Sequence, residues 1–276
     1  MKIIRVFITK TSMTPTDKMV RINSIPGFFD KADEIHISVL FSWDLKRAEY
    51  LKKKWKEVAQ VKIGGPATGE KGFDFIPGLY VRKGAVITSR GCPNKCWFCS
   101  VWKREGNKIR ELPITEGYNL LDDNILACSD KHINAVFEML KEGKKKYKEP
   151  IEFTGGLEAA RLKPWHVDKL RELKPRQLFF AYDTPNDLEP LIYAGKMLLS
   201  SGFTKESHSL RAYVLCGFPG DSFDKAFKRM KEAFNAGFLP MAMLYRDKLN
   251  KPNTLWKRWQ RQFTRPAITH QILKEK

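Results

Sequence analysis

The feature that most constrains the fold is the alternation of strand-like apolar segments with amphipathic helical segments from residue 81 onward. Strands are expected at residues 85–89 (AVITS), 151–156 (IEFTGG), 177–183 (QLFFAYD), 210–217 (LRAYVLCG) and 239–245 (LPMAMLY). The continuous apolar run of QLFFAYD is typical of a strand that is buried on both faces. Repeated β–α units predict an α/β fold with a parallel sheet, and barrel-type curvature fits the pattern as well as an open sheet. In either architecture, ligands bind at the carboxyl ends of the strands.

The helices between these strands are predicted from their start signals and their one-sided apolar faces. Ser129 is the expected N-cap of a helix whose apolar face consists of Ile133, Val136, Phe137 and Leu140. Two more helices are expected, one around Val167 and one at residues 187–200. Asp221 is interpreted as the cap of a further helix, rather than as a ligand; the apolar face of that helix consists of Phe223, Phe227, Met230 and Phe234.

Residues 1–80 are predicted to form a small α/β appendage before this core. Strands are expected at 2–8, 34–40 and 58–65, and a helix is expected to begin after Ser42 as its N-cap. The boundary is expected in the loop GEKGFDFIPG (69–78). The core would then occupy residues 81–250, and a basic, aromatic tail or helix would occupy residues 251–276.

Three cysteines follow the first core strand directly, in the segment TSRGCPNKCWFCSVW (88–102). They are spaced C-x3-C-x2-C, at positions Cys92, Cys96 and Cys99. A structural zinc site, like an ordinary electron-transfer iron–sulfur cluster, takes four protein ligands. No fourth ligand follows nearby, because Cys128 and Cys216 are isolated and the nearest downstream histidine is His132. Three thiolates at this spacing leave one iron of a cluster open to an exogenous ligand.

The segment CPNKCWFC resembles the signature of the radical S-adenosylmethionine (radical SAM) superfamily, with Phe98 in the aromatic position before the third cysteine. The resemblance covers roughly residues 82–246 and implies a partial (β/α)6, TIM-like barrel. It also implies a [4Fe-4S] cluster bound by the three cysteines, whose open iron binds S-adenosylmethionine. In that family the reduced cluster cleaves this cofactor to a 5′-deoxyadenosyl radical. A reducing partner of the flavodoxin or ferredoxin type is therefore expected.

Four further segments resemble cofactor-contacting positions of the same family. FTGGLE (153–158) is similar to its Gly-Gly-Glu segment with Leu157 inserted, which implies that Gly155 and Gly156 let the backbone approach the methionyl amine. Glu158 is either a cofactor ligand or part of a tight strand-to-helix turn. The remaining candidates are Asp183 for the ribose hydroxyls, Gly217 in the turn CGFPGDS (216–222) near the adenine, and the polar pair Asp123 and Asn124 after the cluster loop.

The appendage resembles a shortened remnant of the cobalamin-binding domain that precedes some of these enzymes. It contains no D-x-H-x-x-G motif, and His36 alternates with apolar residues as strand histidines do. We therefore expect that no cobalamin binds. A second cluster would need three more cysteines and only two remain, which favours a single-cluster enzyme that abstracts hydrogen from its substrate. A two-cysteine methylation mechanism is the alternative, and it would require Cys128 and Cys216 to meet at the site. Cys128 and Cys216 are expected to be buried core residues, with hydrogen-atom return by one of them as the alternative.

The charge of the chain indicates a polyanionic partner, with nucleic acid as the first candidate; a solvated lysine-rich surface and an acidic electron-donor protein are the alternatives. Fifty Lys and Arg oppose 31 Asp and Glu, a formal net charge of +19. Of these charges, nine cations and two carboxylates lie in residues 246–276, where the cations are interleaved with Trp256, Trp259 and Phe263. These aromatic residues would either stack on bases or, as we favour, dock a C-terminal helix on the core. No apolar run approaches the ~20 residues of a membrane helix, and a cytoplasmic protein is expected.

Three functional hypotheses follow from the sequence. The first is a radical SAM enzyme that modifies a nucleic acid, in particular RNA. The second keeps the chemistry but acts on a peptide or a small metabolite. The third, from a different class, is a non-catalytic iron–sulfur RNA-binding protein in which the open iron is only capped.

Overall fold

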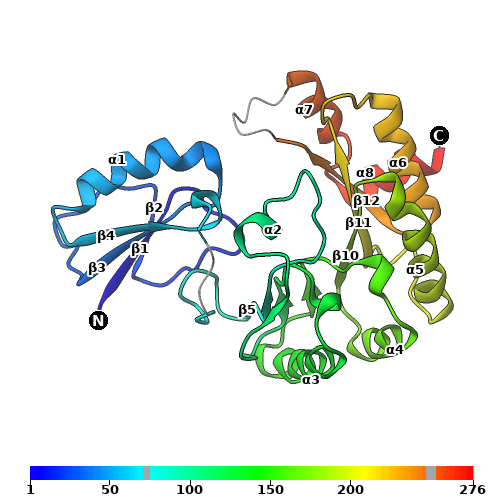
Figure 1. Ribbon diagram of the computed structural model, residues 1–276, viewed down its shortest axis with the longest axis horizontal. Helices are drawn as coiled ribbons and strands as arrows, with labels where there is room; N and C mark the ends of the chain where they lie inside the picture. Colours follow the sequence, from blue (N-terminus) through cyan, green and yellow to red (C-terminus); the bar gives the residue numbers. More distant parts are fainter. Residues whose placement is uncertain (71–74, 247–252, 276) are drawn as a thin grey trace.

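The computed structural model describes residues 1–70, 75–246 and 253–275 and contains two parallel sheets that follow each other along the chain (Figure 1). The first sheet has four strands in the order β2-β1-β3-β4. Its strands are β1 (Ile3–Phe7), β2 (Val20–Ile22), β3 (Glu34–Ser38) and β4 (Gln60–Gly64). The second sheet has six strands in the order β12-β11-β10-β9-β8-β5. All pairs within both sheets are parallel, which confirms the predicted α/β class.

The strands of the second sheet are β5 (Ala85–Val86), β8 (Asn119–Leu120), β9 (Glu152–Phe153), β10 (Gln177–Tyr182), β11 (Leu210–Cys216) and β12 (Leu239–Leu244). A separate antiparallel pair, β6 (Ser89–Arg90) and β7 (Arg110–Glu111), comes between β5 and β8 in the sequence. The helices are α2 (Val101–Arg104), α3 (Asp130–Tyr147), α4 (Pro164–Leu173), α5 (Leu188–Ser200), α6 (Phe223–Asn235), α7 (Thr254–Arg261) and α8 (Pro266–Glu275).

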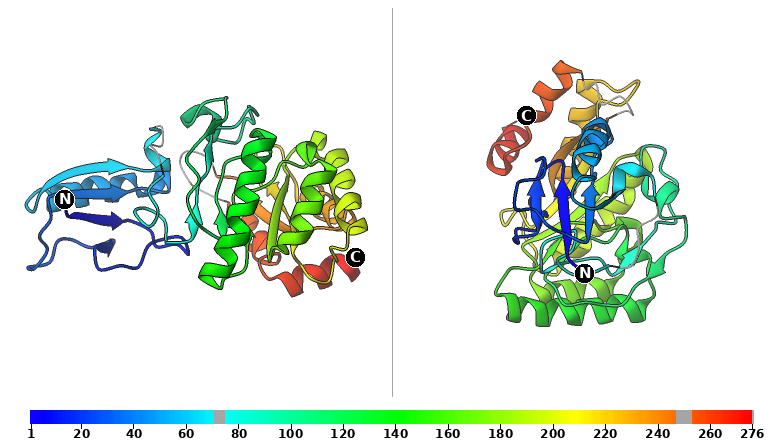
Figure 2. Two further views of the ribbon diagram at one scale, coloured as in Figure 1. Left: turned by 90° about the horizontal axis from the view of Figure 1, so that it is seen from below. Right: turned by 90° about the vertical axis from the view of Figure 1, so that its left-hand side faces the viewer.

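The strands of the second sheet are hydrogen-bonded in sequence order, and this order decides where the helices lie. Because parallel crossovers are right-handed, consecutive neighbours place all their helices on the same face. Helices α3 to α6 accordingly form one layer over one face (Figures 1 and 2). On β11, Ala212, Val214 and Cys216 belong to the apolar core beneath this layer, whereas Arg211 and Tyr213 lie half-buried on the other face. Among the described strands, β5 and β12 remain unpaired edges, so the sheet is open.

The first sheet has its own apolar core, formed with α1 (Leu45–Trp55) on one face. Leu51 and Trp55 of α1 are fully buried against Ile35 and Ile37 of β3. The prediction that Ser42 caps this helix is wrong, because Ser42 begins a 3-10 turn (Ser42–Asp44) and makes no capping bond. The turn continues directly into α1, so the helix needs no side-chain cap at Ser42.

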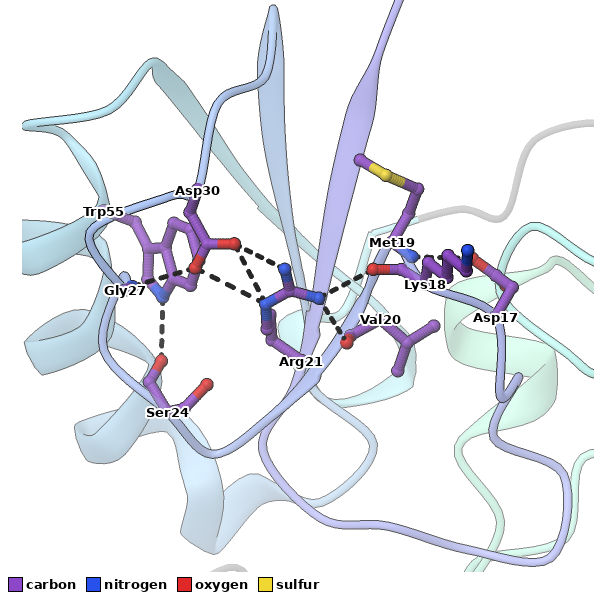
Figure 3. A network of polar contacts seen from close by, with 9 residues as sticks. All are labelled: Asp17, Lys18, Met19, Val20, Arg21, Ser24, Gly27, Asp30 and Trp55. Atoms are coloured by element: carbon purple, nitrogen blue, oxygen red, sulfur yellow. Dashed lines mark hydrogen bonds and ion pairs between the residues drawn. The ribbon is translucent and has the colours of Figure 1, made fainter.

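The connections on either side of β2 contain no helix, and a polar network holds them instead (Figure 3). Arg21 of β2 donates to both carboxylate oxygens of Asp30 and to the carbonyl oxygen of Lys18 at 2.8 Å. The Gly27 amide donates to the same Asp30 carboxylate at 2.8 Å, and the indole of Trp55 donates to Ser24 O at 2.9 Å. This network replaces the helical crossovers that usually connect parallel strands.

Several expected strands are shorter in the structure, and three were not predicted. The expected strand 85–89 is divided into β5 and β6, which belong to different sheets, and the expected strand 151–156 is reduced to β9. The unpredicted strands β2, β7 and β8 have three, two and two residues. Such short segments carry too few residues for a recognisable alternation of apolar and polar side chains.

The two helix starts predicted within the core give one confirmed and one wrong prediction. Ser129 caps α3, since its hydroxyl accepts the His132 amide at 3.2 Å. Asp221 does not cap α6; Ser222 does, by accepting the Lys225 amide at 3.2 Å. The fully buried Asp221 side chain instead accepts from the Gly217 amide and from Arg229, both at 2.8 Å.

The aromatic residues of the tail dock on the core, as favoured from the sequence. Trp256 and Trp259 of α7 pack against the main apolar cluster, and the ring centroid of Trp256 lies 4.5 Å from that of Phe223 on α6. Phe263 is 3% exposed. The expected boundary loop 69–78 lies partly outside the described residues, as do the end of the expected core and the start of the tail. None of the described helices is long and apolar enough to cross a membrane.

Candidate functional site

The cysteine loop follows β6 and is held in place by backbone contacts with the segment before β7. Gly91 has φ +92°, and a Cβ atom there would lie 2.3 Å from Lys108 O, so only glycine fits. The Cys92 amide donates to Gly106 O at 3.3 Å, and the indole of Trp102 donates to Cys96 O at 3.0 Å. These contacts hold the loop at the carboxyl end of β5 and β6.

The three thiols of this loop are half-buried and near one another. Burial first, and then the neighbouring thiols and the carboxylates of Asp187 and Asp183, raise the pKa of Cys96 to about 11. Burial also raises the pKa of Cys99. Both thiols are therefore protonated at neutral pH, and binding of a metal centre must displace their protons. The influence of the two carboxylates also means that the end of β10 lies within electrostatic reach of Cys96.

In the described part of the chain, no group of three or more His, Cys, Asp or Glu side chains is arranged to hold one metal ion. This finding does not test the expected cluster, because each thiolate of a [4Fe-4S] cluster binds a different iron. The chemistry of the donor set fits such a cluster. Cys92, Cys96 and Cys99 are free thiols on one loop, and all three are partly accessible to solvent.

Three of the predicted site residues come together from three different segments. The Asn124 side-chain amide, after β8, donates to Glu158 Oε2 at 2.6 Å and to Cys92 Sγ at 3.6 Å. Arg161 donates to the same Glu158 oxygen at 2.6 Å. Asn124 Oδ1 is buried without a hydrogen-bond partner. The arrangement places an amide and a carboxylate beside the first cysteine of the loop, with one buried acceptor available to a ligand.

A buried carboxylate that was not predicted joins β8 to the cysteine loop. Asp122 is 1% exposed and accepts from the Thr88 amide at 2.6 Å, from the Thr88 hydroxyl at 2.7 Å and from the Ser89 hydroxyl at 2.5 Å. Burial raises the pKa of Asp122 to about 6. The neighbouring Asp123 accepts from the Gly91 amide at 3.0 Å. The two adjacent aspartates in LLDDN (120–124) were the signal in the sequence, but the prediction included only Asp123 and Asn124.

Asp183 lies at the end of β10, where the apolar run predicted it. Its carboxylate accepts from the Leu215 amide at 3.1 Å. Burial, followed by the charge of Asp187, raises the pKa of Asp183 to about 7. Asp187 itself is bound locally, because its carboxylate accepts from the amides of Asp183 and Thr184 at 3.0 and 2.7 Å. Within the described residues, the Asp183 carboxylate thus accepts one hydrogen bond and retains acceptor capacity.

The three candidate glycines differ in what their surroundings require. A Cβ atom on Gly155 would lie 2.2 Å from Asp122 O, and one on Gly217 would lie 2.7 Å from the Leu244 side chain, so both positions have a packing explanation. Gly156 has φ +97° and its nearest neighbour, Phe179 O, would be 3.9 Å from a Cβ atom. The space beside Gly156 is open, which allows close approach of a ligand to its backbone.

Aromatic side chains extend the site to the last two strands. Trp97 is 53% exposed, and its ring centroid lies 5.4 Å from the half-buried Phe98. It also contacts Phe218, which follows β11, at 5.7 Å, and Tyr245, which follows β12, at 5.4 Å. The loop after the first strands thus meets the carboxyl ends of the last two strands of the sheet.

In comparisons with known proteins, no protein-family model matches the chain, and no curated protein matches it. The functional argument therefore depends on the residues themselves.

Proposed function

We propose that this protein is a radical SAM enzyme in which Cys92, Cys96 and Cys99 hold a [4Fe-4S] cluster. The observation that carries the proposal is the position of these thiols at the carboxyl ends of a parallel sheet, with Asn124 and Glu158 beside Cys92. Three cysteines with no fourth protein ligand suit a cluster whose remaining iron binds the amino acid part of S-adenosylmethionine. When bound, the cluster and S-adenosylmethionine would supply a one-electron reductive cleavage of S-adenosylmethionine and, as its result, hydrogen abstraction from the substrate.

The side chains around the loop have distinct roles in this proposal. Asn124 donates to Cys92 Sγ at 3.6 Å and would hold this side chain in position beside the cluster. Glu158, oriented by Arg161, is placed to accept from an ammonium group near the loop. Asp183 would accept from ribose hydroxyls, and the open backbone at Gly156 would contact the same ligand. Phe98 and Gly217 would line the remainder of the site.

For the architecture of the core we propose a partial (β/α)6, TIM-like barrel. Sequential parallel strands with their helices on one face are the arrangement found in such a barrel. Trp97 lies in the loop that β5 leads into through β6, and it contacts Tyr245, which directly follows β12 at the opposite edge of the sheet from β5. This contact supports a sheet that curves, so that its first and last carboxyl ends approach each other.

We propose RNA as the substrate, on the basis of charge. The net charge is +19, and the aromatic residues of α7 are used for docking, which leaves its cations outward: Arg258 and Arg261 are exposed. Such a surface suits phosphate contacts. A peptide or small metabolite as substrate is the alternative within the same chemistry. The reaction also needs an electron donor of the flavodoxin or ferredoxin type, and an acidic donor would suit the basic surface.

Anaerobic reconstitution with iron and sulfide, followed by dithionite reduction, tests the enzyme proposal. The wild-type protein should convert S-adenosylmethionine to 5′-deoxyadenosine and methionine, measured by chromatography. Cys92→Ala, Cys96→Ala and Cys99→Ala should each abolish this cleavage. Cys128→Ala is the matched control, because this buried thiol lies outside the loop and its loss should leave cluster assembly intact. A reduced, iron-loaded wild-type protein that cleaves no cofactor would favour the non-catalytic iron–sulfur protein instead.

A further inference from the structure

A row of aromatic rings connects the cysteine loop to the N-terminal sheet. Beginning in the loop, Trp97 contacts Tyr245 at 5.4 Å between ring centroids. The next residue, Arg246, lies over the ring of Trp43 at 5.0 Å, and Trp43 stacks on Phe41 at 4.6 Å with an interplanar angle of 3°. We call these five residues, Trp97, Tyr245, Arg246, Trp43 and Phe41, the aromatic stripe.

The stripe crosses from one sheet to the other at their carboxyl ends. Phe41 and Trp43 follow β3, whereas Tyr245 and Arg246 follow β12. Figure 1 shows the N-terminal sheet with its strands directed toward the core, and α2, which follows the cysteine loop, between the two. The Arg104 side chain of α2 donates to Pro66 O, after β4, at 3.4 Å. A ligand that lies along the stripe would therefore extend from the N-terminal sheet to the proposed cluster.

The exposure of the rings argues against a purely structural role. Trp43 is 41% exposed although it stacks on Phe41, and Trp97 is 53% exposed although its ring contacts Tyr245 at an interplanar angle of 48°. Tryptophan side chains that serve only as packing bury most of their surface, and contiguous exposed apolar area marks an interaction site. The docked Trp256 and Trp259 of α7, both half-buried against the core, illustrate the structural alternative in the same chain.

The charges beside the stripe favour an anionic partner. Arg246 belongs to the stripe itself, and the exposed Lys95 precedes Trp97 by two residues. Lys103 lies over the ring of Trp102 at 5.2 Å, in the helix that follows the cysteine loop. Two carboxylates adjoin the stripe in sequence: Asp44 accepts a hydrogen bond from the Thr9 hydroxyl at 2.7 Å, and Asp247 lies outside the described residues. Rings with interleaved cations are the surface that binds the bases and phosphates of a single strand.

We infer that the aromatic stripe binds single-stranded RNA and leads it to the cysteine loop. The inference rests on the proposed function, since it specifies how an RNA substrate reaches the site. Paired bases already stack on each other within a duplex, whereas unpaired bases are free to stack on protein rings. The N-terminal sheet thereby acquires a function, which is to contribute Phe41 and Trp43 to substrate binding.

Fluorescence anisotropy of a short fluorescein-labelled RNA of mixed sequence tests the inference on the full-length protein. Single-stranded RNA should bind more tightly than the duplex of the same sequence. Trp43→Ala should weaken this binding at least about fivefold, because each stacked base contributes a factor of that size or more. Trp43→Phe, which keeps a ring, should retain most of the affinity. Circular dichroism should show that all variants are folded.

Phe28→Ala is the matched control, because Phe28 is 94% exposed and lies outside the stripe. The inference is overturned if Trp43→Ala binds as tightly as wild type, or if Phe28→Ala weakens binding equally. It is also overturned if single strand and duplex bind alike. Binding is measured without cofactor cleavage, so loss of 5′-deoxyadenosine formation would contradict the proposed enzyme and leave this result unaffected. If the wild-type protein binds no RNA, a peptide or metabolite substrate is favoured and the inference fails with the RNA assignment.

Discussion

At the scale of single residues, the site consists of side chains that restrain one another. Glu158 accepts from both Asn124 and Arg161, and Asn124 also contacts Cys92, so a carboxylate, an amide and a thiol are coupled over two hydrogen bonds. The sequence left Glu158 with two interpretations, a cofactor ligand or part of a tight turn. The observed contacts favour a position in the site, because a residue that only shapes a turn has no need to bind a side chain next to the cysteine loop.

Glu158→Gln separates these two interpretations. The substitution keeps the size of the side chain and removes its charge. If Glu158 binds the cofactor ammonium, the KM for S-adenosylmethionine should rise about 10- to 100-fold with a smaller change in kcat, the range expected for a charged hydrogen bond. Steady-state kinetics of reductive cleavage measure both constants. An unchanged KM with a lowered melting temperature would instead assign Glu158 to the turn.

His166 provides a residue-scale prediction about stability. Burial, and next the charge of Lys163, lower the pKa of His166 from 6.5 to about 4. The unfolded chain therefore binds more protons than the folded one between these values, so stability is full above pH 6.5 and falls as the pH decreases toward 4. Protonation of this fully buried side chain should lower the free energy of unfolding by about 3 kcal/mol between pH 6.5 and 4.

Urea unfolding of wild type and His166→Gln between pH 4 and 8 checks this prediction. Glutamine at this third helical position can still accept the Lys163 amide, as His166 Nδ1 does at 3.0 Å. The variant should lose less free energy of unfolding between pH 6.5 and 4 than wild type does. The comparison at pH 8 measures the cost of the substitution itself, and parallel curves for the two proteins would contradict the assignment.

At the scale of elements, the start of α6 shows how a helix cap and a turn share neighbouring residues. Ser222 supplies the cap, while Asp221 binds the Gly217 amide and Arg229. A cap is worth about 1 kcal/mol, whereas removal of one partner of a buried ion pair costs about 3–5 kcal/mol. Both side chains of the Asp221–Arg229 pair are buried, at 0% and 12% exposure.

We therefore expect Asp221→Ala to reduce the free energy of unfolding by more than twice as much as Ser222→Ala. Denaturant titrations at pH 7 measure both values. The opposite order would return Asp221 to the capping role expected from the sequence. Asp221 also holds the Gly217 amide, and the next residue, Phe218, contacts Trp97. Asp221→Ala should therefore also alter the tryptophan fluorescence of the cysteine loop.

At the scale of the whole molecule, the strong positive charge of the chain provides a test of the proposed RNA partner. A net charge of +19 gives an association that depends on counterion release if that partner is RNA. The logarithm of the binding constant should fall linearly with the logarithm of salt concentration, by roughly 0.7 per phosphate contact for a single strand. Anisotropy titrations at several potassium chloride concentrations measure this slope. Weak, salt-insensitive binding would favour a small-molecule substrate.

The sequence by itself determined the longer elements of this protein and the cysteine pattern on which the functional proposal depends. The apolar runs of β10, β11 and β12, the Ser129 cap and the spacing of Cys92, Cys96 and Cys99 are local patterns, and local patterns can be recognised without the fold. The same holds for the docking of the tail, because its aromatic residues recur on one helical face.

Only the tertiary structure decided which residues meet. The coupling of Asn124, Glu158 and Cys92, the burial of Asp122 under Thr88 and Ser89, and the stacking of Arg246 on Trp43 join residues far apart in the chain. Such contacts depend on how the ends of parallel strands come together, and no periodicity encodes them. The predictions that Ser42 and Asp221 cap helices are wrong for the same reason. Each is a good capping residue by type, but the neighbouring backbone and Arg229 determine what each one binds.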